Sequence, residues 1–273
     1  MKKRVAIQGI KGSFHHIVAL SYFGDGIEID PLLTFHQVVN QVVTGKVDAA
    51  VMALENSIAG SIIPNYAHID SNSLAITGEY YLEVEHNLMA LRGQKIKDII
   101  EVYSHPMALL QCQNFFKKHP KIKLVEDSDT AEVAQRISNK NLLQVAAIAS
   151  SKAAKLYNLE ILEKNIQTIQ QNETRFVIIE RASKINLNDN KASLKFVLDH
   201  KRGSLAAMLN VMSDCKLNLT KIQSLPIITT PWKYAFFVDV TFENLSDYEK
   251  AKSIMEIMAE EFKILGTYKK AKL

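Results

Sequence analysis

Three short polar clusters recur in order along this chain, and each combines groups that bind anions or move protons. The clusters are Glu55-Asn56-Ser57, Ser104-His105-Pro106 with Gln111, and Asn172-Glu173-Thr174-Arg175-Phe176. Carboxylate and imidazole groups serve acid–base reactions, while amides and hydroxyls hold a polar substrate. Each cluster follows or lies within an apolar, β-branched run, and ligand-binding residues gather at strand ends in open α/β sheets. We therefore expect the three clusters to form one site.

The first two clusters also suit ordinary helix starts. Asn56 or Ser57 could cap a helix, and His105 precedes a proline that belongs in the first turn of a helix running to about residue 119. Gln111 lies seven residues after Ser104, about two turns on, so the two share a face. Both interpretations remain open, because three polar residues exceed what one cap requires.

The third cluster is predicted to be a strand with two different faces. Asn172, Thr174 and Phe176 share one face of it, because side chains alternate along a strand. Glu173 and Arg175 face the other way. If Thr174 points into a cleft, Arg175 either forms an ion pair behind it or reaches the ligand around the strand's edge. An ordinary amphipathic strand is the simpler alternative.

A glycine loop near the start of the chain could receive an anion. A strand at 5–8 runs into Gly9-Ile10-Lys11-Gly12-Ser13, and a helix is expected from about Phe14. Backbone N–H groups and the positive end of the helix dipole would then face whatever lies above that strand. A tight turn explains the glycines at least as well. The loop is not a dinucleotide fingerprint, because the third glycine and the acidic residue are missing.

Alternating strands and helices must position these clusters. Short strands, each followed by a helical stretch, are expected at 5–8, 49–54, 99–103 and 145–149. This alternation indicates an α/β domain with a largely parallel sheet. A stretch rich in Asn, Asp and Lys at 182–192 is predicted to be a linker. We therefore predict a first domain, a linker and a second domain at 1–181, 182–192 and 193–273.

The order of strands and helices in the second domain can be predicted from its sequence. Its apolar periodicity predicts a strand, a helix, two strands, a helix and a strand, at 193–199, 203–215, 218–228, 233–242, 247–262 and 264–269. The order βαββαβ is that of a ferredoxin-like unit. Such units are common in small regulatory domains, although fold alone does not give function.

Length, charge and cysteine content narrow the class of protein. At 273 residues with 47% hydrophobic content, the chain can bury a large core. Its net charge of +4 comes from dispersed basic residues, which argues against nucleic-acid binding and permits an anionic small-molecule substrate. Cys112 and Cys215 match no metal-ligand spacing, so free thiols in a reducing compartment are expected. No signal peptide or membrane span is recognised, which predicts a cytoplasmic protein.

Together these motifs resemble those of the prephenate dehydratase family over nearly the whole chain. The glycine loop, the Glu-Asn-Ser, Ser-His-Pro and Thr-Arg-Phe motifs and a C-terminal ACT domain occur in the family's order. The resemblance implies an α/β catalytic domain of two lobes, similar to a type 2 periplasmic-binding-protein fold, with the active site in the cleft. It also implies a lyase that converts prephenate to phenylpyruvate, water and carbon dioxide in L-phenylalanine biosynthesis, with no cofactor or metal.

The resemblance further assigns roles to residues. It implies that Thr174 contacts the leaving hydroxyl, and because a threonine hydroxyl is a very weak acid, we expect Glu55 or His105 to supply the proton. The implied substrate-binding residues are Gly12, Ser13, Asn56, Ser57, Ser104, Gln111, Asn172, Arg175 and Phe176. At His15 the glycine loop departs from the family's usual serine, so no substrate role is assigned there.

The C-terminal unit resembles ACT domains that bind phenylalanine between subunits and inhibit the enzyme. The implied allosteric contacts are Gly203, Ser204, Leu205, Ala206, Asn218, Leu219, Gln223 and Ser224. Gln223 and Leu225 replace the family's Glu and Arg, so the sequence does not set the strength of inhibition. A homodimer or homotetramer is expected by the same resemblance.

Three other classes of protein remain open. An arogenate dehydratase would share every motif, because nothing in them separates an alanyl from a pyruvyl side chain. A solute-binding protein would share the two-lobed fold but is usually exported. A regulatory protein without catalysis would have no use for Glu55, His105 and Thr174 at strand ends.

Overall fold

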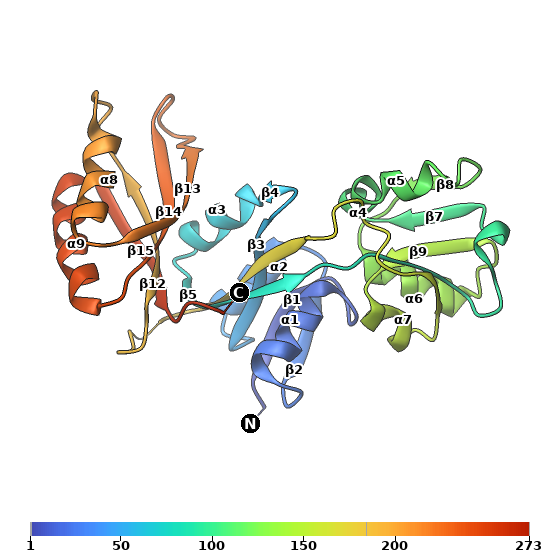
Figure 1. Cartoon of the computed structure of the whole chain (residues 1–273). Helices are drawn as coiled ribbons and strands as arrows, with labels where there is room; N and C mark the ends of the chain where they lie inside the picture. The colour runs from blue at the N-terminus through green and yellow to red at the C-terminus, as the bar shows by residue number, and fades with distance from the viewer. Residues whose placement is uncertain (1, 184, 273) are drawn as a thin grey trace.

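Three β-sheets organise the chain, and Figure 1 shows them in a row in this computed structural model. The structure describes residues 2–183 and 185–272. Met1, Lys184 and Leu273, which fall in the predicted first domain, linker and second domain, lie outside the described residues. The strand orders are β2-β1-β3-β11-β5 with β4 on β3, then β10-β6-β9-β7-β8, then β13-β14-β12-β15.

The first lobe is built on one sheet, whose strands come from before and after the second lobe in the chain. Its elements are β1 (Arg4–Gln8), α1 (Phe14–Phe23), β2 (Glu28–Leu32), α2 (Phe35–Val43), β3 (Ala49–Asn56), β4 (Gly60–Ser61), α3 (Ile63–Ser71), β5 (Ala75–Glu83) and β11 (Glu173–Glu180). Strands β1, β2 and β3 are parallel, and β11 is antiparallel to both β3 and β5. The chain leaves this lobe after β5 and returns along β11, so two adjacent strands connect the lobes.

The second lobe is inserted between β5 and β11. Its elements are β6 (Asn87–Ala90), η1 (Ile96–Asp98), β7 (Glu101–Ser104), α4 (Pro106–Gln111), α5 (Gln113–Phe116), β8 (Lys123–Glu126), α6 (Thr130–Lys140), β9 (Val145–Ala149), α7 (Ser151–Leu156) and β10 (Glu160–Glu163). The predicted helix from Pro106 to about His119 is instead two short helices. Cys112, between them, has φ −101° and ψ 8°, outside the helical region, and its side chain is fully buried.

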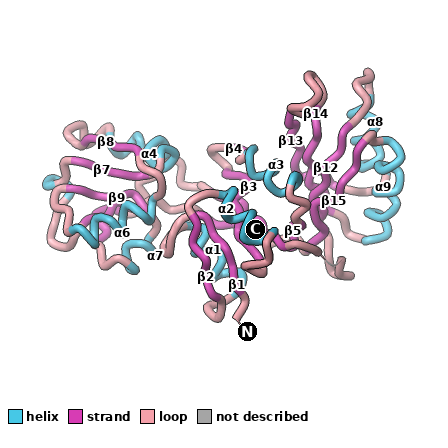
Figure 2. Tube along the Cα trace, turned by 180° about the vertical axis from the view of Figure 1, so that it is seen from behind, coloured by secondary structure: helices cyan, strands magenta, loops and turns pink. Residues whose placement is uncertain are grey.

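The C-terminal unit, defined here as residues 191–268, has the predicted βαββαβ order. Its elements are β12 (Lys191–Val197), α8 (Ser204–Asp214), β13 (Asn218–Pro226), β14 (Tyr234–Thr241), α9 (Leu245–Met258) and β15 (Glu261–Tyr268). Seen from behind in Figure 2, α8 and α9 cover the outer face of its sheet. Strand β12 starts inside the predicted linker, because the buried Lys191 side chain is held by Glu79 at 2.7 Å.

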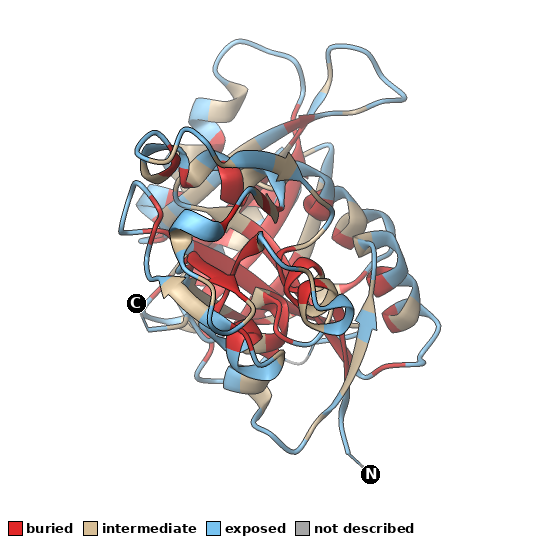
Figure 3. Ribbon diagram, turned by 90° about the vertical axis from the view of Figure 1, so that its right-hand side faces the viewer, coloured by how far each residue is buried: buried red, intermediate tan, exposed pale blue. Residues whose placement is uncertain are grey.

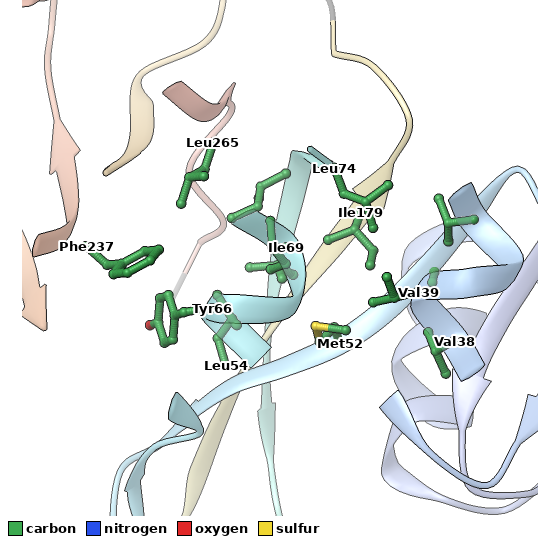
Figure 4. Packing of buried hydrophobic residues seen from close by; sticks show 14 of the residues in the cluster. Val38, Val39, Met52, Leu54, Tyr66, Ile69, Leu74, Ile179, Phe237 and Leu265 are labelled. Carbon is green, nitrogen blue, oxygen red and sulfur yellow. The ribbon is translucent and has the colours of Figure 1, made fainter. Parts of the chain in front are cut away.

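An apolar cluster joins the C-terminal unit to the first lobe. Figure 4 shows Phe237 and Leu265 of the C-terminal sheet beside Tyr66 and Ile69 of α3, and the rings of Tyr66 and Phe237 meet edge to face at 5.4 Å. Burying such side chains is the main favourable term in folding. Figure 3 shows buried residues concentrated in the central strands. The two-lobed α/β domain with a ferredoxin-like unit is thus confirmed.

None of the helices in the described ranges is long and apolar enough to cross a bilayer.

Candidate active site

A cleft of about 420 Å³ is lined by residues of both lobes. This volume suits a small organic ligand. The first lobe contributes Gln8, Ser13, Phe14, His15, Phe35, Ala53, Asn56, Ala59, Ile62, Thr174 and Phe176, and the second lobe with its connection contributes Val84, His86, His105, Met107, Ala108, Gln111, Ser128, Asp129 and Thr130. All three predicted clusters therefore reach one cavity.

Strands β3 and β11 bring Asn56 and Thr174 side by side. The two residues are paired in register, and Asn56 Nδ2 donates to Thr174 Oγ1 at 2.9 Å. Asn56 Oδ1 accepts from the backbone N–H groups of Ile58 and Ala59, which fixes the amide's orientation. Because Thr174 Oγ1 accepts from Asn56, the threonine proton is available to a ligand.

A β-bulge in β3 determines which side chains face the cleft. Arg175 of β11 pairs with Glu55, but Phe176 pairs with Ala53, so β3 has one extra residue, Leu54. Such a bulge re-aims the side chains beside it. As a result Ala53 and Asn56 line the cleft, whereas Leu54 and Glu55 face the C-terminal unit.

An amide network joins the two lobes behind Thr174. Asn172, which is fully buried, accepts from Asn56 at 2.7 Å and donates to Gln111 Oε1 at 3.0 Å. The same Gln111 oxygen lies 2.8 Å from His86 Nε2. An oxygen that accepts from Asn172 also accepts here, so His86 carries its proton on Nε2. Asn172 and Gln111, both predicted, thus hold Asn56 in place.

Three histidines line the cleft, and the surroundings of each favour the neutral ring. Burial lowers the pKa of His15 to about 3 and also lowers the pKa values of His86 and His105. His15 lies edge-on to Phe176 at 5.0 Å and accepts from the Ala53 N–H at 3.4 Å. Its role in the wall is therefore to shape the cavity.

His105 is both a helix cap and part of the cleft. Its Nδ1 accepts from the Met107 N–H at 3.2 Å, so the neutral ring carries its proton on Nε2. Capping of α4 thus does not exclude His105 from the cleft wall. A neutral N–H donor at the cleft wall can bind a carboxylate without carrying a charge.

Several predicted site residues lie outside the cleft. Glu55 forms an ion pair with Lys221 of the C-terminal unit at 2.7 Å. Ser104 is fully buried and donates to the Ile148 carbonyl at 2.8 Å, and Ser57 accepts from the Glu173 N–H at 3.0 Å.

The backbone groups of Gly12 in the glycine loop form hydrogen bonds with other residues of the chain. The Gly12 N–H donates to His16 Nδ1 at 3.0 Å, and the Gly12 carbonyl accepts from Ser150 Oγ of the second lobe at 2.7 Å. Ser13 lines the cleft while its hydroxyl oxygen caps α1 through the His16 N–H. Gly12 therefore packs the loop against the second lobe, and Ser13 is the part of the loop that reaches the cleft.

Arg175 faces away from the cleft, as alternation along β11 predicts once Thr174 faces it. Its guanidinium donates to Glu79 at 2.7 Å, to Asp239 and to the Tyr268 hydroxyl at 2.9 Å. Asp239 and Tyr268 belong to the C-terminal unit, so Arg175 joins this unit to the strand that carries Thr174. The buried charges hold the pKa of Asp239 below its usual value and that of Arg175 well above.

Two titratable residues of the cleft, His86 and Asp129, were not predicted from the sequence. His86 follows β5 without any motif that marks it. Asp129 is the N-cap of α6, with Oδ1 accepting from the N–H groups of Ala131 and Glu132, both at 2.9 Å. An acidic residue before a helix is an ordinary capping signal, so its place in the cleft was not apparent. In the described ranges no group of three or more His, Cys, Asp or Glu could hold a metal.

The predicted effector contacts lie on two neighbouring elements of the C-terminal unit. Gly203, with φ +88°, is the N-cap of α8, and Ser204, Leu205 and Ala206 form its first turn. Asn218, Leu219, Gln223 and Ser224 lie along β13, the edge strand against which α8 packs.

Comparison with known proteins supports one family. The family model described as "Prephenate dehydratase" matches residues 5–184. The curated protein Arogenate dehydratase/prephenate dehydratase 2, chloroplastic, of Arabidopsis thaliana is 37% identical over 280 residues, covering 97% of this chain and 72% of that protein.

Two solved structures share the fold over nearly the whole chain. A protein described as a novel type of quorum-quenching acylase has a TM-score of 0.88 at 27% identity and covers 98% of both chains. A prephenate dehydratase from Arthrobacter aurescens, in complex with L-Phe, has a TM-score of 0.88 at 23% identity, covering 97% of this chain and 89% of the other.

Proposed function

The chain belongs to the prephenate dehydratase family, and we propose that the cleft between its two lobes is the active site of this lyase. The reaction converts prephenate to phenylpyruvate, water and carbon dioxide in L-phenylalanine biosynthesis. The observation that carries the site assignment is the Thr174 hydroxyl. It faces a cavity of suitable size, with its oxygen fixed by Asn56 and its proton free.

The reaction requires positioning more than covalent chemistry. The ring becomes aromatic when hydroxide and carbon dioxide leave together, so the enzyme must assist the leaving hydroxyl and desolvate the ring carboxylate. Thr174 can donate a hydrogen bond to that hydroxyl. The apolar side chains of Phe14, Phe35, Met107 and Phe176 line the same cleft. A carboxylate held against them is poorly solvated and is destabilised relative to neutral carbon dioxide.

The substrate's carboxylates must be bound largely by neutral donors. The described cleft-lining residues include no lysine or arginine. His105 Nε2–H and the Ser13 hydroxyl are donors at the wall, and α1 and α6 begin beside Ser13 and Asp129 with the positive ends of their dipoles.

We also infer that L-phenylalanine inhibits through the C-terminal unit, in a cytoplasmic homodimer or homotetramer. The phenylalanine complex of the Arthrobacter aurescens protein and the retained Asn218-Leu219-Thr220 motif support this inference. Contacts from Lys221 and Asp239 to residues adjacent to Asn56 and Thr174 provide a physical connection. A coupling of roughly 1–3 kcal/mol is typical of allosteric sites.

Product formation by the purified protein tests these proposals. We expect phenylpyruvate from prephenate, with a lower rate in saturating L-phenylalanine. L-Phenylalanine formed from arogenate at a higher kcat/KM would instead identify an arogenate dehydratase. Acyl-amide hydrolysis without turnover of either substrate would assign the cleft to the acylase class, and unchanged kinetics in L-phenylalanine would refute the regulatory inference.

A further inference from the structure

Asp129 is the one carboxyl group among the described residues that line the cleft. Prephenate brings two carboxylates into this cleft, where no lysine or arginine offsets them. An ionised Asp129 would repel the substrate, whereas a protonated Asp129 would not. A protonated carboxyl also holds the proton that a departing hydroxide needs.

The two carboxyl oxygens of Asp129 have different neighbours. Oδ1 accepts from the Ala131 and Glu132 N–H groups and so is committed to capping α6. Oδ2 has no hydrogen-bond partner within the described ranges and lies against Gly9 of the first lobe, 2.9 Å from where a Cβ would be. Because Gly9 has no side chain, the Asp129 carboxyl of the second lobe can pack against the backbone of the first lobe.

The burial of Asp129 favours its protonated form. Burial, which is the largest influence, and the neighbouring Glu132 raise the pKa of Asp129, while the two backbone N–H groups and His105 lower it in part, and the net direction is upward. Tyr157, the residue after α7, also interacts electrostatically with this carboxyl. A dianionic substrate beside it would raise the pKa further.

The other titratable groups of the cleft have no suitable proton to give. His105 and His86 are neutral rings whose remaining N–H is a very weak acid, and His15, with a pKa lowered to about 3, is neutral as well. Thr174 is a hydroxyl and an equally poor acid. Glu55 is on the reverse face of the sheet, paired with Lys221.

We propose that Asp129 is the general acid of this dehydratase, a role that rests on the proposed function. As the ring C–O bond breaks, the Oδ2 proton passes to the leaving oxygen, which departs as water. The bond to the ring carboxylate breaks at the same time, its electron pair enters the ring, and carbon dioxide leaves. Asp129 remains as a carboxylate and regains a proton from solvent. Thr174 aligns the leaving oxygen by a hydrogen bond.

Two substitutions separate acid catalysis from helix capping. Asn and Ser both cap helices well, so Asp129→Asn and Asp129→Ser retain the start of α6 but cannot transfer the proton. We expect kcat for prephenate to fall by about a hundredfold to ten-thousandfold, while KM stays within threefold of the native value. Asp127→Asn is the matched control, because Asp127 is two residues away, pairs with Arg136 and does not line the cleft.

The pH profile gives a second readout. The native kcat should decline as pH rises through the pKa of Asp129 in the complex, since the protonated form is active. Both variants should lack this decline. A kcat within threefold of native in Asp129→Asn, persistence of the alkaline decline, or a rise in KM with unchanged kcat would each overturn the proposal.

Proton uptake on binding tests Asp129 without turnover. A prephenate analogue with a saturated ring cannot become aromatic, and its binding can be followed by calorimetry in buffers of different ionisation enthalpy between pH 5 and 8. The native protein should take up a proton in part of this range, and Asp129→Asn should not. Equal uptake, or none in either protein, would contradict the proposal. Absence of prephenate turnover in the native protein would count against the proposed function, and calorimetry would still decide the state of Asp129.

Discussion

At the scale of single residues, the proposed mechanism depends most directly on the hydroxyl of Thr174. We expect Thr174→Ala to lose at least a hundredfold in kcat, because the leaving hydroxyl loses its aligned donor while the fold persists. Phenylpyruvate release from prephenate measures this, with circular dichroism as the control for folding. Near-normal turnover would remove Thr174 from the mechanism.

His15 predicts how stability depends on pH. Its pKa is about 3 in the folded protein, against 6.5 for histidine in an unfolded chain, so between these two pH values only the unfolded chain binds the proton. The stability associated with a neutral His15 is thus complete above pH 6.5 and declines as pH falls, by up to about 1.4 kcal/mol per unit.

Comparing native protein with His15→Ser tests this dependence. Denaturant titrations give the free energy of unfolding at each pH between 6.5 and 4. This free energy should fall less steeply with decreasing pH in the variant, by up to about 1.4 kcal/mol per pH unit, which corresponds to one proton. Serine has no titrating group, so equal slopes in the two proteins would show that His15 is not buried in neutral form.

At the scale of elements, the sequence predicted the strands that carry the site but not the bulge in β3. Strict alternation places Glu55 on the same face as Ala53, which is the cleft face. The extra residue, Leu54, instead puts Asn56 beside Thr174 and turns Glu55 toward Lys221. Nothing in the local residue types marks this bulge, because it depends on pairing with β11, more than a hundred residues later.

By contrast, the faces of β11 could be predicted. Alternation alone separated Thr174 and Phe176 from Arg175, and the structure confirms the separation. The break at Cys112 could not be read from sequence, because helix propensity is a weak signal that tertiary packing overrides. Asp129 is a residue type common at helix caps, and it reaches a cleft because the two lobes meet there.

Close approach of β15 to β5 gives a prediction about docking of the C-terminal unit. A Cβ on Gly266 would lie 2.0 Å from the Ile76 carbonyl oxygen, so Gly266→Ala must displace one strand. Overpacking of this kind typically costs about 1–3 kcal/mol, and we expect a lower midpoint of thermal unfolding.

Gly26→Ala is the matched control for this substitution, because nothing lies within 4 Å of the added Cβ. An unchanged midpoint in Gly266→Ala, with the control also unchanged, would show that the two strands do not approach this closely in solution.

At the scale of the whole molecule, strands β3 and β11 of the first lobe line the cleft on one face and contact the C-terminal unit on the other. Asn56 and Thr174 face the cleft, and their neighbours Glu55 and Arg175 bind Lys221 and Asp239 on the other side. A shift of the C-terminal unit would therefore act on both strands next to the groups that we propose contact substrate. Such coupling requires that L-phenylalanine favour one of two arrangements of the unit.

Lys221→Met tests this coupling while leaving the buried Arg175 cluster intact. Lys221 binds Glu55 at 2.7 Å and Ser61 at 2.8 Å, and neither partner lines the cleft. We expect the uninhibited kcat to stay within threefold of native, because every cleft group remains. Inhibition by saturating L-phenylalanine should weaken at least fivefold, which is the lower end of typical allosteric coupling. Lys233→Met, which removes an ion pair with Glu260 inside the C-terminal unit, should leave inhibition unchanged. Equal inhibition in native protein and Lys221→Met would mean that the signal passes through Arg175 and Asp239 alone, or that the two strands do not carry it.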